Sequence, residues 1–340
     1  MLQAKAYPYV LKFKRPGGTS RGVLTEKESW MLEVWDTENP EVVGVGECGI
    51  LRGLSADDRG GYEEKVKEVA QRIHEPLADL YEALREWPSI QFGLEMSLRD
   101  LELGGKHVFY PGAFTEGKMG IPINGLIWMG TQDFMLEQIE AKLAQGFSCL
   151  KMKIGAIDFE KELECLEFIR QQKSKQEIEL RVDANGAFTP ENALEKLTAL
   201  AQFDLHSIEQ PIKAGQPEAM RELCAKTPLP IALDEELIGV FQAEEKGKLL
   251  DEIQPQYVIF KPSFIGGFKG TQEWIDAANA RNMGWWITSA LESNVGLNAI
   301  AQYTATLGVE MPQGLGTGGL FTNNIDRPLE IQNGQLFYKA

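Results

Sequence analysis

Five charged residues recur at nearly even spacing through the middle of the chain, and together they could carry out proton transfer at carbon. Lys153, Asp183, Glu209, Asp234 and Lys261 each end a short apolar run, and neighbours in this series are 25 to 30 residues apart. That interval matches one strand-and-helix unit of a parallel barrel, whose strand ends all face one mouth. We therefore expect these five side chains to meet in one site.

Three of the five are carboxylates, and their convergence predicts a metal site. Asp183, Glu209 and Asp234 would repel one another strongly without a counterion. Their oxygen atoms suit Mg²⁺, with Mn²⁺ as a substitute, and the absence of His or Cys from these positions disfavours zinc. A single strand-end Asp is more often a turn residue or a helix cap. The regular repeat favours the metal interpretation.

The lysines of the series are the expected acid–base groups. Lys151 and Lys153 are two residues apart on one expected strand, so both side chains would enter the barrel. Neighbouring ammonium groups lower each other's pKa, as a nearby metal does, and a lysine tuned in this way can remove a proton from carbon. Lys261 would lie across the mouth. Taken alone, Lys-X-Lys is usually surface charge, and its place in the series is what favours catalysis.

Further polar residues near these strand ends could support the site. Asn185 and Arg181 share a strand face with Asp183 by alternation, which places them where they could support the metal ligands. Glu235 directly follows Asp234 and fits either an outer partner of the metal or a helix N-cap.

The glycine-rich segment Gly314–Gly319 has two interpretations. Some barrels bind phosphate with a loop after the last strands, but this segment contains no Lys or Arg. A tight turn that lines the substrate pocket is therefore favoured. The three histidines, His74, His107 and His206, fall at none of the expected strand ends, so we expect structural roles for them.

Bulk composition excludes several classes of protein. The net charge is −16 with no cluster of Lys and Arg, which argues against nucleic-acid binding. No apolar run approaches the roughly 18 residues of a membrane helix, and the N-terminus does not resemble a signal peptide. The four cysteines match no metal-binding spacing, so reduced thiols and a cytoplasmic location are expected. The expected partner is a small-molecule carboxylate, and a homo-oligomer is compatible with the sequence.

The order of elements predicts a (β/α)₈ TIM-type barrel with an N-terminal α+β capping domain. We expect the cap at residues 1–115, the barrel at 116–320, and a segment 321–340 that returns to the cap. An open doubly wound sheet is the alternative, but no GxGxxG follows an early strand. The expected barrel strands are Ile121–Gly125, Cys149–Lys153, Leu180–Asp183, Ser207–Glu209, Ile231–Asp234, Val258–Lys261, Trp286–Ser289 and a short eighth strand before Pro312–Gly318.

Helical spacing of apolar residues marks the segments between these strands, and the cap reads as a small antiparallel sheet followed by helices. Pro16–Gly18 is the expected turn or flexible loop between the first two cap strands, and Arg15–Leu24 is the expected lid. The expected cap strands are Ala6–Lys14, Trp30–Trp35 and Val42–Cys48. The expected helices are Tyr62–His74, Phe92–Leu103, Phe134–Ala144, Phe159–Gln171, Pro190–Ala201, Glu218–Lys226 and Thr271–Arg281.

Five short motifs, in this order, resemble those of the muconate-lactonizing branch of the enolase superfamily. They are Lys-Met-Lys at 151–153, Val-Asp-Ala-Asn at 182–185, Ile-Glu-Gln-Pro at 208–211, Leu-Asp-Glu at 233–235 and Phe-Lys-Pro-Ser at 260–263. The resemblance covers nearly the whole chain, and Gly46-Glu47-Cys48 is similar to a segment of that branch's capping domain. Enolase-superfamily sites combine a Lys or His base with Mg²⁺.

Two further segments, Ser289–Leu297 and Pro312–Gly318, resemble the members of that branch that make 2-succinylbenzoate for menaquinone synthesis. The resemblance implies dehydration of a succinyl-hydroxycyclohexadiene carboxylate through an enediolate, with the metal on the ring carboxylate. Lys153 would take the α-proton and then assist loss of hydroxide, while Lys261 stays cationic. The implied substrate-binding residues are Ser263, Ser289, Ser293, Asn294 and Gly316.

The main alternative is a racemase of N-acylamino acids that uses Lys153 and Lys261 as two bases, or another epimerase or cycloisomerase of the branch. Dipeptide epimerases typically carry an acidic Asp-X-Asp after the eighth strand, whereas Gly314–Gly319 contains no acid. A non-catalytic binding protein is the alternative from another class, and the complete set of charged groups argues against it.

Overall fold

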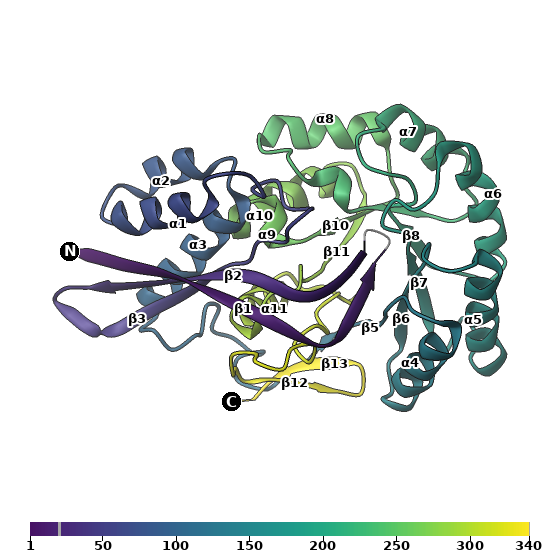
Figure 1. Cartoon of the computed structure of the whole chain (residues 1–340), viewed down its shortest axis with the longest axis horizontal. Coiled ribbons are helices and arrows are strands. Elements are labelled where there is room, and N and C mark those ends of the chain that lie inside the picture. Colours follow the sequence, from purple (N-terminus) through teal and green to yellow (C-terminus); the bar gives the residue numbers. More distant parts are fainter. Residues whose placement is uncertain (20–21, 340) are drawn as a thin grey trace.

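A long antiparallel sheet with three helices lies against a curved parallel sheet ringed by helices in the computed structural model, which describes residues 1–19 and 22–339 (Figure 1). The first unit is the capping domain and the second is the barrel, so the fold class expected from the sequence is confirmed. The hairpin of the cap sheet extends from the cap over the barrel, where its described residues Gly22–Leu24 line the main cavity.

The cap sheet has strand order β1-β2-β3 within the described residues, and both pairings are antiparallel. Apolar side chains of one sheet face pack against the helices. Helix α3 lies close to β3 because the contact uses glycines: a Cβ on Gly46 would come within 1.9 Å of the Gly93 carbonyl oxygen. The cap elements are β1 (Leu2–Thr19), β2 (Gly22–Asp36), β3 (Asn39–Cys48), α1 (Tyr62–Gln71), α2 (Leu77–Leu84) and α3 (Pro88–Glu102).

The expected turn at Pro16–Gly18 is wrong. Strand β1 continues to Thr19, with a shift in its register between Lys12 and Gly17. Gly18 bridges to Met129 of the barrel, and a Cβ on it would meet the Met129 carbonyl oxygen at 2.7 Å. The lack of a side chain at Gly18 therefore lets strand β1 lie close to the barrel. Of the expected lid Arg15–Leu24, residues 20 and 21 lie outside the described residues.

The barrel sheet contains, within the described residues, seven strands in the order β11-β10-β9-β8-β7-β6-β5. All six pairings are parallel. The strands are β5 (Gly125–Ile127), β6 (Cys149–Lys153), β7 (Glu179–Asp183), β8 (Ser207–Glu209), β9 (Ile231–Leu233), β10 (Tyr257–Phe260) and β11 (Gly284–Ile287). The helices that follow them are α4 (Gln132–Ala144), α5 (Phe159–Gln172), α6 (Pro190–Ala201), α7 (Pro217–Lys226), α8 (Ala243–Ile253), α9 (Pro262–Ile265), α10 (Gly267–Asn279) and α11 (Asn294–Ala305), with a 3₁₀ turn η1 (Glu235–Leu237).

The first expected barrel strand, Ile121–Gly125, divides in two. Ile121–Pro122 forms β4, which pairs with the C-terminal strand β13, and the barrel strand β5 begins only at Gly125. Pro122 lacks the N–H that a central barrel strand needs, which accounts for the break. The remaining expected barrel strands from 149 to 289 agree with β6 to β11 within two residues at each end.

The prediction of an eighth strand before Pro312 is also wrong, since the described residues contain no strand there. Gln313–Gly314 closes the barrel instead. Ile123 bridges to Gln313 and Thr288 bridges to Gly314, both in parallel. The buried Gln313 side chain accepts a hydrogen bond from Ile287 N and donates one to Met311 O. A side-chain amide thus replaces part of the missing ladder.

Helix α11 was missed because it is buried on nearly every side, so it carries no amphipathic pattern. Helices α2 and α8 were missed as well. Within residues 1–19 and 22–339, no helix is both long and apolar enough to cross a membrane.

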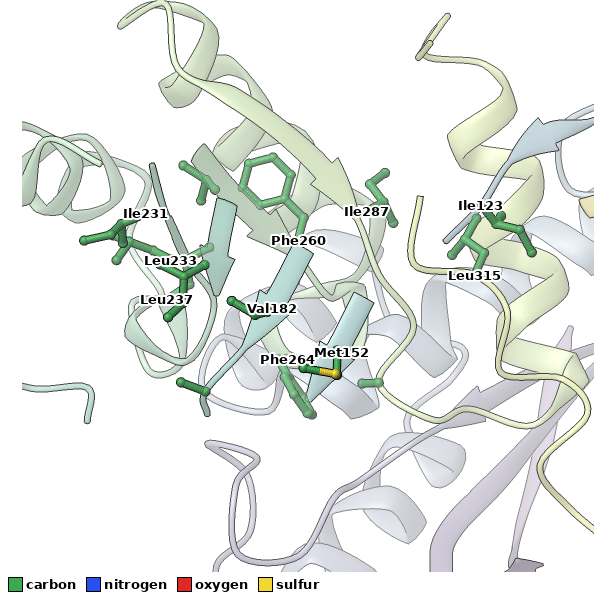
Figure 2. Packing of buried hydrophobic residues seen from close by; sticks show 14 of the residues in the cluster. Ile123, Met152, Val182, Ile231, Leu233, Leu237, Phe260, Phe264, Ile287 and Leu315 are labelled. Atoms are coloured by element: carbon green, nitrogen blue, oxygen red, sulfur yellow. The ribbon is translucent and has the colours of Figure 1, made fainter. Parts of the chain in front are cut away.

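The main core lies around the barrel strands, where apolar residues pack toward the helices (Figure 2). Met152 and Val182 belong to it and alternate with charged residues of β6 and β7. Ile231 and Phe260 belong to it as well, next to the apolar residues Ala232 and Ile259 of a smaller cluster. Arg181 does not reach the metal ligands as expected from alternation. Its guanidinium bonds to Glu179 and to the Pro312 carbonyl oxygen. The four cysteines are buried and unpaired.

The C-terminal segment contacts both units. Asn323 bonds to the backbone of β1 at Lys12 and Val10, while β12 (Leu329–Gln332) and β13 (Gln335–Tyr338) form a sheet with β4 at the barrel's edge. The segment therefore ties the cap hairpin to the start of the barrel.

We predict that Gln313→Leu destabilises the fold. The change leaves the buried Ile287 N–H and Met311 carbonyl without their partners, which costs about 1–3 kcal/mol. Urea denaturation followed by circular dichroism measures the loss, and Gln202→Leu, at an exposed position at the end of α6, is the matched control. Equal midpoints for the two variants would contradict the closing role of Gln313.

Candidate functional site

A cavity of about 310 Å³ lies at the carboxyl ends of the barrel strands, under the cap. The cap contributes Gly22–Leu24 from the start of β2 and Leu51–Leu54 from the segment after β3. The barrel contributes the charged floor, which includes Lys151, Lys153 and Lys261. The cavity is therefore complete only when both units are in place.

The parallel register brings the charged residues together. Lys153 pairs with Asp183, and Asp183 pairs with Glu209, across three adjacent strands. The Lys153 Nζ donates to Asp183 Oδ2 at 2.8 Å, and the Lys151 Nζ lies 2.5 Å from Glu209 Oε2 and 3.5 Å from Asp183 Oδ2.

On the other side, Lys261 follows β10 directly and bonds to Asp234, which follows β9. Its Nζ is also 3.4 Å from Glu209 Oε1. Glu209 therefore lies between the two groups of charges. All five residues of the series expected to meet do meet here, and Lys151 joins them.

Asn185 and Glu235 extend the cluster. Asn185 adopts a left-handed backbone conformation with φ of 44°, which Asn tolerates better than most residues. Its side chain accepts from Lys153 at 2.7 Å and donates to Glu235 Oε1 at 3.1 Å. Glu235 is the first residue of η1 and not its N-cap, so the structure places it as an outer partner of the cluster.

The carboxylates outnumber the lysines in this cluster, and the pKa values reflect that excess. Burial opposes it, but Lys153 and Lys151 hold the pKa of Asp183 well below its usual range. Burial raises the pKa of Asp234 well above its usual range, and Glu235 adds to this rise against the lowering effect of Lys261. Asp234 therefore takes up a proton more readily than Asp183 or Glu209 does.

The expected lowering of the pKa is wrong for Lys151 in this arrangement, and the pKa of Lys261 is raised as well. Burial alone would lower them, but Glu209 and Asp183 raise the pKa of Lys151, and Asp234 and Glu209 raise that of Lys261. The sequence argument counted the neighbouring ammonium groups and omitted the carboxylates that lie closer.

The donor set of this cluster fits a hard divalent cation. Asp183, Glu209 and Asp234 offer buried carboxylate oxygens, and neither sulfur nor imidazole is among them. With Glu235 the cluster holds four carboxylates and three lysines. In the described part of the chain, no three acidic, His or Cys side chains lie close enough together, as they stand, to hold an ion. The ammonium groups of Lys151 and Lys261 lie between the carboxylates.

Only two of the five expected substrate-binding residues line the cavity. Ser289 and Gly316 do so. Ser263 is buried and donates to Glu292, and Ser293 caps α11 and bonds to Glu47. Asn294 lies at the start of α11, away from the cavity lining. Ser293 and Asn294 belong to the segment Ser289–Leu297, in which the chain turns away from the cavity after Leu291. Ser263 belongs to Phe-Lys-Pro-Ser and bonds to Glu292 instead.

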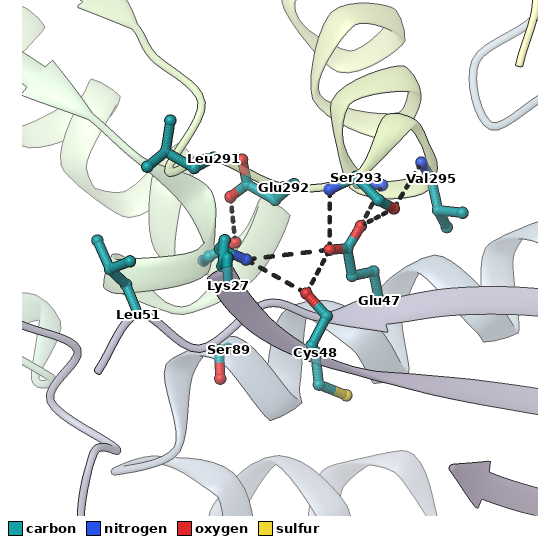
Figure 3. Close-up of polar contacts among 12 residues, drawn as sticks. Lys27, Glu47, Cys48, Leu51, Ser89, Leu291, Glu292, Ser293 and Val295 are labelled. Atoms are coloured by element: carbon teal, nitrogen blue, oxygen red, sulfur yellow. Dashed lines mark hydrogen bonds and ion pairs between the residues drawn. The ribbon is translucent and has the colours of Figure 1, made fainter. Parts of the chain in front are cut away.

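These serines belong to a buried network that joins the cap to the barrel (Figure 3). Glu47 of β3 accepts hydrogen bonds from Ser293 N, Ser293 Oγ and Gly296 N at the start of α11. It also accepts from Ser29 Oγ, and the fully buried Lys27 ammonium lies 4.0 Å from it. Glu47 thus anchors the cap sheet to a barrel helix.

The same network reaches the cavity through Glu292. Its two carboxylate oxygens accept from Ser263 Oγ and from Ser289 Oγ. Ser289 Oγ also accepts from Thr317. Leu291, which precedes Glu292, has a positive φ of 66°, a strained conformation for a bulky residue. This turn of the backbone places Glu292 beside Ser263 and Ser289. The Ser289 hydroxyl is therefore fixed in place at the cavity wall.

Several cavity residues were missed from the sequence. Asn124 and Thr288 line the cavity, and each has a buried side-chain oxygen without a hydrogen-bond partner among the described residues. Trp128 faces Lys153, whose Nζ is 5.8 Å from its ring centroid. The signal for Asn124 was present, since it is a polar residue inside the apolar run Ile121–Ile127. Trp128 and Thr288 read as ordinary strand residues.

Comparison with known proteins places the chain among enolase relatives. The family model described as "Enolase C-terminal domain-like" matches residues 135–338. The chain is 48% identical to o-succinylbenzoate synthase of Desulfotalea psychrophila, with 96% of each protein covered. The crystal structure of MenC from that organism matches with a TM-score of 0.88 at 43% identity, covering 99% of each chain. A dipeptide epimerase from Enterococcus faecalis, solved with Mg and a dipeptide, shares the fold with a TM-score of 0.84 at 19% identity, covering 99% of this chain and 96% of that one.

We predict that Glu47→Ala strongly destabilises the protein. The substitution removes four hydrogen bonds and leaves the buried Lys27 without its carboxylate, and such a loss costs about 3–5 kcal/mol. Urea denaturation is the measurement, and Glu38→Ala at an exposed position in the turn between β2 and β3 is the control. A Glu47→Ala protein as stable as the control would refute the anchoring role.

Proposed function

This chain belongs to the o-succinylbenzoate synthase family of the enolase superfamily, and we propose that its charged cavity dehydrates 2-succinyl-6-hydroxy-2,4-cyclohexadiene-1-carboxylate to 2-succinylbenzoate. The observation that carries the proposal is the placement of two lysines on either side of three carboxylates. Lys153 ends β6 and Lys261 follows β10, with β7, β8 and β9 between them. A ring bound over the carboxylates would meet one ammonium group on each face.

Lys153 is the proposed general base and acid. It takes the proton from the carbon that bears the ring carboxylate, and the electron pair moves into an enediolate. The same ammonium then protonates the departing hydroxyl on that face, so that water leaves and the ring becomes aromatic. Asn185 and Asp183 hold the Lys153 Nζ in place through their hydrogen bonds at 2.7 and 2.8 Å.

Lys261 is the proposed electrostatic partner on the opposite face. Its ion pairs with Asp234 and Glu209 keep it protonated, and a fixed cation there stabilises the negative charge of the enediolate. Lys151 lies deeper, between Glu209 and Asp183, where it supports the position of both carboxylates.

Members of this superfamily generally use Mg²⁺. We propose that Asp183, Glu209 and Asp234 hold this ion, for which their oxygen donors and the cluster's excess of carboxylates over lysines provide the support. When bound, Mg²⁺ supplies positive charge that offsets the carboxylates and stabilises the charge that develops on the substrate's carboxylate. The cap residues Leu24, Leu51 and Leu54 would exclude water from above.

Racemisation of N-acylamino acids is the second candidate. Both lysines line the same cavity, which is what a two-base exchange of the α-proton requires. The two reactions differ in the role of Lys261. In racemisation it exchanges a proton with the substrate, and in dehydration it only supplies positive charge. Incubating the purified protein with Mg²⁺ and each substrate, and following 2-succinylbenzoate formation and loss of optical activity, tests which reaction dominates. Much faster racemisation would demote the synthase activity to a side reaction.

We predict that Asp183→Asn, Glu209→Gln and Asp234→Asn each weaken Mg²⁺ binding and abolish most turnover while the fold stays intact. Each change removes a charged oxygen ligand from the proposed ion. Calorimetric Mg²⁺ titration and the synthase assay measure the two effects, and circular dichroism checks the fold. Treatment with excess chelator should have the same effect on wild-type activity. Full activity in chelator, with no metal found by elemental analysis, would rule out the metal site.

We predict that Lys153→Ala loses dehydration by about 10²- to 10⁴-fold or more, because a general base is removed. Lys261→Arg should retain measurable dehydration, since the charge is kept, but should lose racemisation because a guanidinium does not deprotonate near neutral pH. Both reactions are measured on both variants, with solvent-deuterium exchange as the readout for each face. If the Lys153→Ala protein dehydrates the substrate at the wild-type rate, the general base is misassigned.

A further inference from the structure

A second cavity, of about 280 Å³, opens beside the catalytic one. The two share five lining residues, namely Asn124, Leu126, Trp128, Gly316 and Thr317. We propose that this side cavity binds the carboxylate-bearing side chain of the substrate, with Asn124 at its entrance and Lys142 as the cation at its far end. The inference rests on the proposed function, because it assigns the succinyl arm of that substrate.

The side cavity exists because the barrel is incompletely closed. The segment that closes the barrel, Gln313–Gly319, is joined to the start of the barrel by two backbone hydrogen bonds. Asn124 N donates to the Gln313 carbonyl oxygen, and Gln313 N donates to the Pro122 carbonyl oxygen. Beyond that point, no backbone hydrogen bond joins Gly316–Gly319 to β5 in the described residues. The cap covers the resulting gap from outside with Phe13–Gly17 of β1. The two cavities therefore adjoin at the edge of β5.

The walls of the side cavity suit a short aliphatic chain. Phe13, Phe134, Phe147 and Trp128 line it, and the rings of Phe13 and Trp128 meet edge to face with centroids 6.4 Å apart. Methylene groups would bury apolar surface against these rings.

Asn124 supplies a polar group where the cavities meet. Its side chain is 3% exposed, and its Oδ1 has no hydrogen-bond partner among residues 1–19 and 22–339. The Asn124 Nδ2–H group can donate a hydrogen bond to the ketone of a succinyl group, whereas the Oδ1 atom only accepts and the ketone does not satisfy it.

Lys142 supplies the cation. Its stem lies beside Gly125, where an added Cβ would come within 3.2 Å of the Lys142 Cδ. Its Nζ is 4.9 Å from the Phe147 ring centroid and donates to Gln145 Oε1 at 3.3 Å. No carboxylate pairs with it in the described residues, although the protein is strongly acidic. Burial lowers the pKa of Lys142, as expected for a cation that lacks a counterion.

Lys14 and Arg15 of β1 also line the side cavity, but both are exposed to solvent. Arg52 is a basic residue of the cap that a terminal carboxylate could meet in the catalytic cavity. Its guanidinium already bonds to Glu28 and Asp58, at 2.7 and 2.8 Å. An additional anion would have to compete with two carboxylates there. Lys142 offers an unpaired charge, so the geometry favours the side cavity.

The test compares two ligands that differ only at the end of the arm. We would measure the binding of 2-succinylbenzoate and of 2-butyrylbenzoate, in which a methyl group replaces the terminal carboxylate, by calorimetry with Mg²⁺ present. The proteins are wild type, Lys142→Met, Lys142→Arg and the control Lys161→Met, which removes an exposed lysine on α5. Lys142→Met should weaken the binding of 2-succinylbenzoate about tenfold or more and leave the binding of 2-butyrylbenzoate unchanged. Only the first ligand has a carboxylate that can pair with the Lys142 ammonium group.

Lys142→Arg should restore most of the loss, and Lys161→Met should affect neither ligand. Asn124→Ala should weaken both ligands by a similar factor, because both keep the ketone. If Lys142→Met weakens the two ligands equally, or neither, the subsite is refuted even when the wild type makes 2-succinylbenzoate. If the wild type makes no 2-succinylbenzoate, the proposed function itself fails, and this turnover readout is separate from the comparison of ligands.

Discussion

The burial of opposite charges at one end of the barrel is the constraint on which the rest of this structure depends. Lys153, Asp183 and Glu209 are abreast on adjacent strands, and a shift of one residue in either pairing would turn side chains from the interior to the helix layer. Charged groups are tolerated at this depth only when they are paired. The requirement for pairing therefore fixes the strand register, and the register in turn fixes the chemistry at the barrel mouth.

The cap is part of the site because it is bonded to the barrel by buried polar groups. Glu47 satisfies backbone N–H groups at the start of α11 that a helix leaves without partners. Glu292 continues the connection to Ser289 at the cavity wall. A cap held in this way keeps Leu24 and Leu51 over the charged floor, where a low dielectric strengthens each electrostatic contact.

The incomplete closure of the barrel has two consequences. Gln313 uses its side-chain amide to replace strand hydrogen bonds, so a short bridging segment is sufficient to join β11 to the start of the barrel. Because this bridging segment is short, it does not cover the edge of β5 beyond Asn124. The cap hairpin covers that edge instead. One feature of the fold thus accounts both for the side cavity beside the active site and for the contact of Phe13 and Gly18 with the barrel.

The sequence by itself determined the barrel, the capping domain and the series from Lys153 to Lys261, because strand ends recur once per βα unit and their polar residues interrupt apolar runs. It could not determine contacts between distant segments. The pKa directions of Lys151 and Lys261 depend on carboxylates that only the register brings near. Ser293 shares a motif with Ser289, yet after the strained turn at Leu291 it bonds to Glu47 of the cap. Ser263 bonds to Glu292, which is distant from it in the sequence. Trp128 and Lys142 became site residues only in three dimensions, because their surroundings include β1 and the closing segment, more than a hundred residues away in either direction.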